Sequence, residues 1–175
     1  MSKVTRIALV GASGLIGSAL IRLAVGRSDI RVIAVARREI ALPKGARMEV
    51  LVADPANWAD AIAAANADVL VCALGTTIRK VGGDEAAFKA VDHDLVLACA
   101  SAARDCGIRQ VIVISSVGAD ASSKNFYLRV KGEVEQALGR LRLGRLDVIR
   151  PGLLRGARRA AAHRAGAVSW RGGGA

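Results

Sequence analysis

Three evenly spaced glycines behind a short apolar run constrain the fold of this 175-residue chain most. The run, Val4–Val10, has the length and composition of a buried strand. Gly11, Gly14 and Gly17 follow it and open Leu15–Val25, where apolar residues recur at helical spacing. Such glycines allow a tight turn, close approach of the backbone to a pyrophosphate, and packing of a helix on a strand. The pattern predicts a dinucleotide site at a helix N-terminus, and the alternative is a glycine-rich turn that binds nothing.

Strand and helix patterns then alternate along the chain. The further expected strands are Ile30–Ala36, Met48–Val52, Asp68–Ala73, Gln110–Ser115 and Leu146–Ile149. The further expected helices are Ala56–Ala65, Glu85–Cys106 and Asn125–Leu141. Strands that are β-branched apolar runs separated by helices indicate a parallel sheet covered on both faces. The sequence therefore predicts an α/β chain with a doubly wound parallel sheet, the Rossmann fold.

The chain divides by composition into two parts. Residues 1–155 carry all the periodic elements and are predicted to form a single NAD(P)-binding Rossmann domain. Residues 156–175 are mostly Ala, Arg and Gly, and we expect a basic, poorly ordered tail there.

Composition excludes several classes of protein. An apolar fraction of 53% and a mean hydropathy of +0.35 exclude a disordered chain. No stretch of about 18 residues lacks both charge and glycine, so we expect no membrane span. Ile7–Ile21 could pass for a signal peptide, but its glycines and the lack of an A-x-A cleavage site argue against one. Cys72, Cys99 and Cys106 show no paired spacing and read as free, reduced thiols. We expect a soluble, cytoplasmic protein.

The net charge of +11 raises the possibility of a nucleic-acid partner. Arginine outnumbers lysine 20 to 6, as expected of a GC-rich coding sequence, and two Trp, two Phe and one Tyr make no stacking platform. We therefore expect no specific nucleic-acid binding. The only histidines are His93 and His163, and Asp92-His93-Asp94 is expected on the exposed face of a helix. The sequence thus predicts no metal site.

The end of the second expected strand bears on the choice of cofactor. An NAD site places a carboxylate there for the ribose 2′-hydroxyl, whereas an NADP site places cations for the 2′-phosphate. This strand runs into Arg37 and Arg38, and the first acid is Glu39. Two guanidiniums can clamp a phosphate, so NADP(H) is favoured over NAD(H). The alternative is ordinary surface arginine.

A second group of residues carries proton chemistry. Tyr127 and Lys131 are four residues apart, so one helix face presents both side chains. A nearby ammonium stabilises a phenolate and makes the phenol a usable proton donor at neutral pH. Ser115 and Ser116 precede them at the end of the fifth strand, where the crevice of such a sheet opens. The alternative is a packed tyrosine beside a surface lysine.

Together these motifs resemble the short-chain dehydrogenase/reductases. The spacing G-x-x-G-x-x-G is that of their extended and atypical branches. Further stretches resemble the atypical NAD(P)H-binding subgroup of the Tat-interactive oxidoreductase-like protein and of bacterial proteins labelled nucleoside-diphosphate-sugar epimerases. These stretches are Ala73-Leu-Gly-Thr-Thr77, Phe88-Lys-Ala-Val-Asp-His-Asp94, Ser115-Ser-Val-Gly118, Phe126-Tyr-Leu-Arg-Val-Lys-Gly-Glu133 and Arg150-Pro-Gly-Leu-Leu154. The resemblance covers about residues 4–156.

The resemblance implies a role for each matching position. Ser115 or Ser116 would hydrogen-bond a substrate oxygen, Tyr127 would act as acid and base, and Lys131 would bind the nicotinamide ribose. The implied cofactor contacts are Gly11, Ser13, Gly14, Leu15, Ile16 and Gly17 at the turn, Arg37 and Arg38, Asp54 at the adenine, Ala73, Leu74 and Gly75 beside its ribose, and Pro151 in a segment, Arg150-Pro151-Gly152, that closes over the nicotinamide.

The implied function is an NADP(H)-dependent oxidoreductase or epimerase-like enzyme acting on an unidentified small molecule. The alternative is a non-catalytic NADP(H)-binding sensor or regulator. Two departures stand out: Asp92 occupies the place of an active-site Asn, and the chain turns at Gly156 into Arg/Ala/Gly sequence where relatives continue. We therefore expect a truncated or divergent C-terminus, and an apolar face left exposed by it would favour a homo-oligomer.

Overall fold

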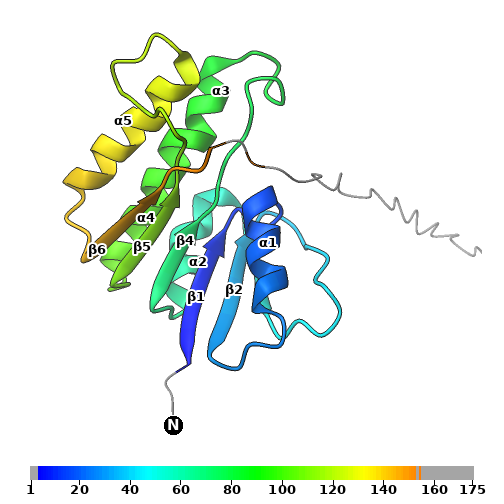
Figure 1. The fold of residues 1–175 in the computed structure, drawn as a ribbon. Coiled ribbons are helices and arrows are strands. Elements are labelled where there is room, and N and C mark those ends of the chain that lie inside the picture. Colours follow the sequence, from blue (N-terminus) through cyan, green and yellow to red (C-terminus); the bar gives the residue numbers. More distant parts are fainter. Residues whose placement is uncertain (1–3, 153, 155–175) are drawn as a thin grey trace, which may run out of the picture.

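The first strand, β1 (Thr5–Val10), lies near the centre of a six-stranded parallel sheet (Figure 1). The computed structural model describes residues 4–152 and 154. The strand order is β3-β2-β1-β4-β5-β6, and every neighbouring pair is parallel. The other strands are β2 (Ile30–Ala36), β3 (Glu49–Val52), β4 (Val69–Cys72), β5 (Gln110–Ile114) and β6 (Arg145–Ile149). The predicted Rossmann fold is confirmed.

Helices pack on both faces of this sheet, because consecutive residues of each strand point to opposite faces and the strands are apolar on both. On one face, Leu9 of β1 packs with Ile21 of helix α1 (Leu15–Ala24). On the opposite face, Ala8 and Val10 belong to a larger cluster with side chains of three other helices. These are α2 (Trp58–Ala64), α4 (Leu95–Asp105) and α5 (Phe126–Arg140).

The α1 face of the sheet is covered less completely toward β6. Ile112 and Ile114 of β5 are half-buried, and Ile149, which pairs with Ile114 in β6, is 48% exposed. The expectation that both faces are covered therefore holds best over β1 and β2. The predicted homo-oligomer stays a prediction.

The long helix expected over Glu85–Cys106 is interrupted. Helix α3 (Glu85–Lys89) runs into a wide turn of π-helix, η2 (Ala90–Asp94), before α4 begins. Asp92 lies in this wide turn and is 1% exposed, so the expectation that it faces solvent is wrong. The physical reason is its spacing: Asp92 is four residues from both Phe88 and Val96, which are buried.

The remaining elements match the sequence patterns within one or two residues at most ends. The helix expected over Ala56–Ala65 begins as a turn of 3-10 helix, η1 (Pro55–Asn57), before α2. None of the helices in the described part of the chain is long and apolar enough to cross a membrane. The tail expected over residues 156–175 lies outside the described residues.

Candidate functional site

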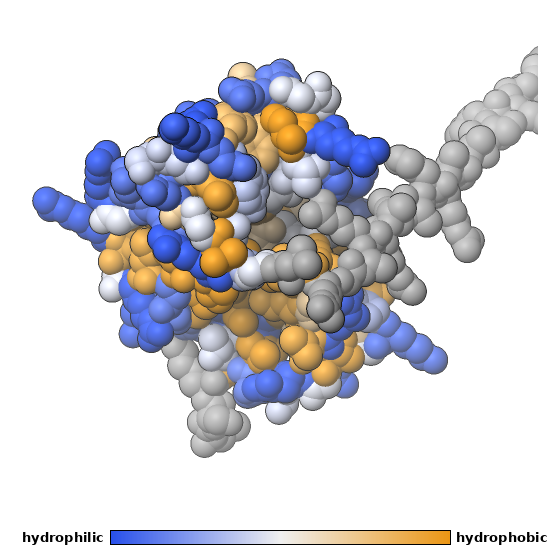
Figure 2. All heavy atoms as spheres, turned by 45° about the horizontal axis from the view of Figure 1, so that its top comes forward, coloured by the Kyte–Doolittle hydropathy of each residue, from blue (hydrophilic) through white to orange (hydrophobic). Residues whose placement is uncertain are grey.

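A cavity of about 210 Å³ opens at the carboxyl ends of the strands. The chain runs outward from β1 to β3 and then returns to β4 on the other side of β1. Loops on the two sides therefore part between β1 and β4, which is where ligands bind in open α/β sheets. Figure 2 shows this end of the molecule, with a hollow near its centre. The lining residues are Ser13, Gly14, Leu15, Ile16, Ala73, Leu74, Gly75, Thr76, Lys80, Asp92, Ile114, Ser115, Ser116, Tyr127, Lys131, Pro151, Gly152 and Leu154.

The glycine turn forms one wall, and two of its glycines are required by close packing. Gly11 has φ +83°, and a Cβ there would lie 2.3 Å from the carbonyl oxygen of Ala73 behind β4. A Cβ on Gly17 would lie 2.3 Å from the carbonyl oxygen of Gly11, so α1 could not approach the turn. No side chain among the described residues caps α1 at Gly14. The first amide groups of α1 are therefore left for solvent or for an anion.

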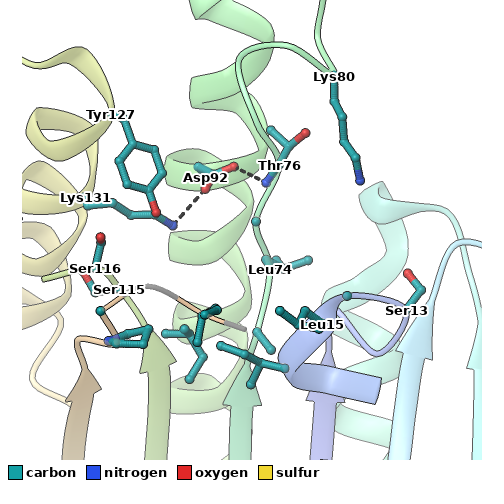
Figure 3. Close-up of a pocket in the computed structure, with 18 residues that line it drawn as sticks. Ser13, Leu15, Leu74, Thr76, Lys80, Asp92, Ser115, Ser116, Tyr127 and Lys131 are labelled. Atoms are coloured by element: carbon teal, nitrogen blue, oxygen red, sulfur yellow. Dashed lines mark hydrogen bonds and ion pairs between the residues drawn. The ribbon is translucent and has the colours of Figure 1, made fainter. Parts of the chain in front are cut away.

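Helix α5 brings the predicted tyrosine and lysine to the opposite wall. The Nζ atom of Lys131 lies 5.8 Å from the ring centroid of Tyr127. Tyr127 is 39% exposed and packs edge-on against Phe88, whereas Lys131 is only 4% exposed. Gly132 lets the helix approach the preceding loop, because a Cβ there would lie 2.1 Å from the backbone nitrogen of Ala121. The structure thus places both side chains at the cavity (Figure 3).

Asp92 joins this wall from the wide turn η2. Its Oδ1 lies 2.8 Å from Nζ of Lys131, and its Oδ2 accepts a 2.7 Å hydrogen bond from the backbone N–H of Thr76. Both side chains of the ion pair are almost completely buried, at 1% and 5% exposure. A single carboxylate therefore connects η2, α5 and the loop behind β4 (Figure 3).

The two serines that follow β5 in the sequence make different hydrogen bonds. The hydroxyl of Ser115 donates to the carboxylate of Glu135 in α5, and Arg150 pairs with the same carboxylate. Burial alone would raise the pKa of Glu135, but the hydrogen bonds from Arg150 and Ser115 hold that pKa below its usual value. Within residues 4–152 and 154, the hydroxyl of Ser116 makes only a local 3.2 Å bond to the carbonyl of Val117. Both serines line the cavity.

The segment that follows β6 in the sequence covers one side of the cavity. The N–H of Ser115 donates to the carbonyl of Ile149 at 2.8 Å, and the N–H of Val117 donates to that of Pro151 at 3.0 Å. These bonds continue the pairing of β5 and β6 past the strand ends, and they bring Pro151 and Gly152 to the cavity.

Five predicted cofactor contacts do not line this cavity. Arg37 and Arg38 follow β2 and are exposed, and no ion pair holds either of them within the described residues. Asp54 follows β3, and its Oδ1 accepts a 2.9 Å hydrogen bond from the N–H of Ala56 at the start of η1. Their predicted roles toward the adenosine stay predictions. Gly11 and Gly17 shape the turn without lining the cavity.

Sequence reasoning missed several lining residues. Lys80 comes from the loop behind β4, and its side chain extends toward the turn at Ser13 and Leu15 (Figure 3). Thr76, Ile114 and Leu154 also line the cavity. No periodic pattern marks Thr76 or Lys80, but the four-residue steps Phe88, Asp92, Val96 could have revealed Asp92 as inward-facing. Within residues 4–152 and 154, no cluster of three or more His, Cys, Asp or Glu could hold a metal ion.

A Rossmann sheet with a glycine turn at its switch point defines a dinucleotide-binding class of protein. The family described as NAD(P)H-binding matches residues 11–154, and the chain belongs to this family. Proteins named "Protein FMP52, mitochondrial" are similar to it. The one from Eremothecium gossypii is 37% identical over 152 residues, covering 86% of this chain and 66% of the relative. The one from Emericella nidulans is 33% identical over 159 residues, covering 87% and 68%.

Two solved enzyme structures have the same fold. The nucleoside-diphosphate-sugar epimerase from Agrobacterium tumefaciens matches with a TM-score of 0.72 and 17% identity, over 91% of this chain and 56% of that one. The Bordetella bronchiseptica enzyme WbmG in complex with NAD matches with a TM-score of 0.69 and 18% identity, over 85% and 53%. The chain thus spans about two thirds of its curated relatives and little more than half of these neighbours.

The comparison corrects one expectation. The relatives from Eremothecium gossypii, Emericella nidulans and Saccharomyces cerevisiae are all named as mitochondrial proteins. This finding contradicts the predicted cytoplasmic location.

Proposed function

We propose that this chain belongs to an NADP(H)-dependent oxidoreductase that moves a hydride between the nicotinamide and a carbonyl or alcohol carbon. One observation carries the proposal: a single cavity brings the glycine turn together with Tyr127, Lys131 and Ser116. A structural tyrosine would not need to share a cavity with an uncapped helix N-terminus. This arrangement joins a place for a dinucleotide to a place for proton transfer.

The cavity fits the cofactor on two counts. The turn contains positions where any Cβ would collide with backbone, and the start of α1 carries no capping side chain. Ser13, Gly14 and Leu15 would hold the pyrophosphate at the start of α1. Lys131 would hold the nicotinamide ribose on the opposite wall. When bound, the nicotinamide supplies or accepts the hydride.

The protein's own side chains would handle the proton. The phenol of Tyr127 would donate a proton to a carbonyl oxygen during reduction, and the phenolate would remove it from an alcohol during oxidation. Ser116 would hydrogen-bond the same substrate oxygen, because its hydroxyl is held only by a local bond. The balance is one hydride to carbon and one proton to oxygen.

Arg37 and Arg38 support NADP(H) over NAD(H) in this proposal. Both are exposed at the end of β2, where an NAD site would place a carboxylate. Solved neighbours such as WbmG are described with NAD, and titration of this chain with NADPH and NADH distinguishes the two cofactors.

The comparisons extend the proposal to setting and subgroup. The names of the curated relatives support a mitochondrial setting. The fold neighbours among nucleotide-sugar epimerases support the atypical, epimerase-like branch of the short-chain dehydrogenase/reductases, the group of the Tat-interactive oxidoreductase-like protein. An epimerase would use the same hydride step twice, without net consumption of cofactor.

The test is turnover of NADPH with a panel of aldehydes and ketones, alongside isomerisation of nucleotide sugars with NAD⁺ or NADP⁺ added. We expect Tyr127→Phe to lower kcat at least about 100-fold while NADPH affinity changes less than about threefold. The Phe ring keeps the edge contact with Phe88. Undiminished turnover by Tyr127→Phe would refute the acid/base role. Cofactor binding without turnover in either assay would favour the sensor function.

A further inference from the structure

Lys131 carries a charge at a place where water cannot stabilise it. Its side chain is 5% exposed, and its Nζ lies 2.8 Å from Oδ1 of Asp92. A buried ammonium needs an anionic partner, because removing a charge from water costs several kcal/mol. The position and charge of Lys131 therefore depend on a nearby carboxylate.

The other acids near α5 are already engaged. Glu135 interacts with the Lys131 charge at longer range, but its carboxylate binds Ser115 and Arg150. Glu133 pairs with Lys89 at 2.9 Å. Asp92 is therefore the only carboxylate within ion-pair distance of Lys131 in the described part of the chain.

The geometry of Asp92 suits it to hold two walls of the cavity together. Oδ2 accepts the N–H of Thr76, which follows the cavity-lining Ala73, Leu74 and Gly75. Oδ1 has no polar partner other than the ion pair among the described residues. The carboxylate reaches both groups from a π-turn, a feature that is frequent at functional sites.

Stability alone does not account for this pair. Replacing a buried ion pair with apolar side chains of similar volume is often neutral or stabilising. We infer that Asp92 is a positioning residue, which holds Lys131 at the nicotinamide end of the cavity and couples it to the loop behind β4. The inference rests on the proposed cofactor site and does not depend on turnover.

The test compares affinities for whole cofactors and for their adenosine halves. NADPH and NADH are titrated into the wild type, Asp92→Asn, Lys131→Met and the double variant. Adenosine 2′,5′-bisphosphate and ADP serve as the matched fragments, since they lack the nicotinamide ribose. Asp94→Asn is the control: Asp94 lies in the same wide turn, its side chain is 70% exposed, and its one ion pair in the described part of the chain is with His93.

We expect Asp92→Asn to weaken binding of the preferred cofactor by about tenfold or more and to leave fragment binding unchanged. Lys131→Met and the double variant should show the same loss, because both substitutions remove one function. Asp94→Asn should bind like the wild type. Unchanged cofactor affinity in Asp92→Asn, equal loss for cofactor and fragment, or additive losses in the double variant would each overturn the inference.

A variant that does not fold and a wild type that does not bind cofactor are distinguished as follows. If Asp92→Asn does not fold, Asp92→Leu/Lys131→Met removes both charges, and it should fold, bind the fragments normally and bind the cofactor weakly. Normal cofactor affinity in that variant would also overturn the inference. A wild type that binds neither NADPH nor NADH would overturn the proposed function as well, whereas a wild type that binds beside an unaffected Asp92→Asn would overturn only this inference.

Discussion

The hydroxyl of Ser115 donates to the carboxylate of Glu135, which lies 20 positions further along the chain in α5. This bond commits Ser115 to a structural role, whereas the hydroxyl of the adjacent Ser116 makes only a local bond among the described residues. Sequence alone does not distinguish the two hydroxyls, but their bonds assign a structural role to Ser115 and leave Ser116 available to a substrate.

We expect Ser115→Ala to lower stability by about 1–2 kcal/mol, because Glu135 loses a buried donor. Ser116→Ala should lower kcat about tenfold or more with little change in stability. Urea denaturation measures the stability of both variants and an activity assay measures their kcat, so each variant is the control for the other. The reverse pattern would make Ser115 the residue that contacts substrate.

Stability should depend on pH through Glu135. Its pKa is lowered in the folded protein from the ordinary value of 4.5, so its contribution to stability is present above about pH 4.5 and is lost as pH falls through the folded value. Wild type should be more stable than Glu135→Gln at pH 7, and this difference should shrink below about pH 4.5.

Urea denaturation at several pH values measures that difference. Glu39→Gln is the control, because Glu39 is exposed and has no ion pair within the described residues. A difference between wild type and Glu135→Gln that stays constant down to pH 3 would contradict the prediction.

Cofactor choice tests the two arginines behind β2. Charge-assisted hydrogen bonds to phosphate contribute roughly 1.5–3 kcal/mol each, so Arg37→Ala/Arg38→Ala should weaken NADPH binding at least about tenfold. NADH affinity should barely change, since NADH has no 2′-phosphate. Fluorescence titration of the wild type and the double variant with NADPH and NADH gives the four dissociation constants that test this preference.

A second double variant, Arg22→Ala/Arg140→Ala, removes the same charge at exposed positions elsewhere. It should leave both affinities unchanged. A wild type that prefers NADH would show that Arg37 and Arg38 do not select the cofactor.

The three cysteines should differ in reactivity. Burial raises the pKa of Cys72 to about 12, and burial also raises the pKa of Cys99, whereas Cys106 is exposed. Native protein treated with iodoacetamide at pH 7.5 (a value chosen about one unit below the ordinary thiol pKa) should therefore be labelled at Cys106 only. Peptide mapping measures this, and labelling of Cys72 before unfolding would show that β4 opens in the native state.

Sequence patterns predicted the sheet and its glycine turn because those features are local. A buried strand, a turn with a positive φ and the uncapped start of α1 all fall within Thr5–Ile16. The i, i+4 spacing likewise placed Tyr127 and Lys131 on one face. The cavity was harder to predict, because its walls come from four loops and from η2 and α5, and their meeting depends on strand order.

Asp92 shows where the sequence patterns fell short. The polar triplet Asp92-His93-Asp94 is typical of a solvated helix face, and only the buried partner Lys131, 39 positions away, makes an inward carboxylate tolerable. Neither residue alone signals the pair. The loop that carries Lys80 also shows no periodic hydrophobic pattern. Its course is set by tight turns, one of which is closed by a hydrogen bond from the N–H of Lys80 to the carbonyl of Thr77.

The wide turn Ala90–Asp94 has a consequence for how the chain can change by insertion and deletion. A π-turn within a helix holds one residue more than an unbroken α-helix needs over the same rise. A chain shorter by one residue here could therefore keep α3 and α4 packed as they are while withdrawing the carboxylate from Lys131. The packing of α3 and α4 and the presence of a buried carboxylate can therefore change independently. Deletion of one codon would remove the carboxylate and keep the helices.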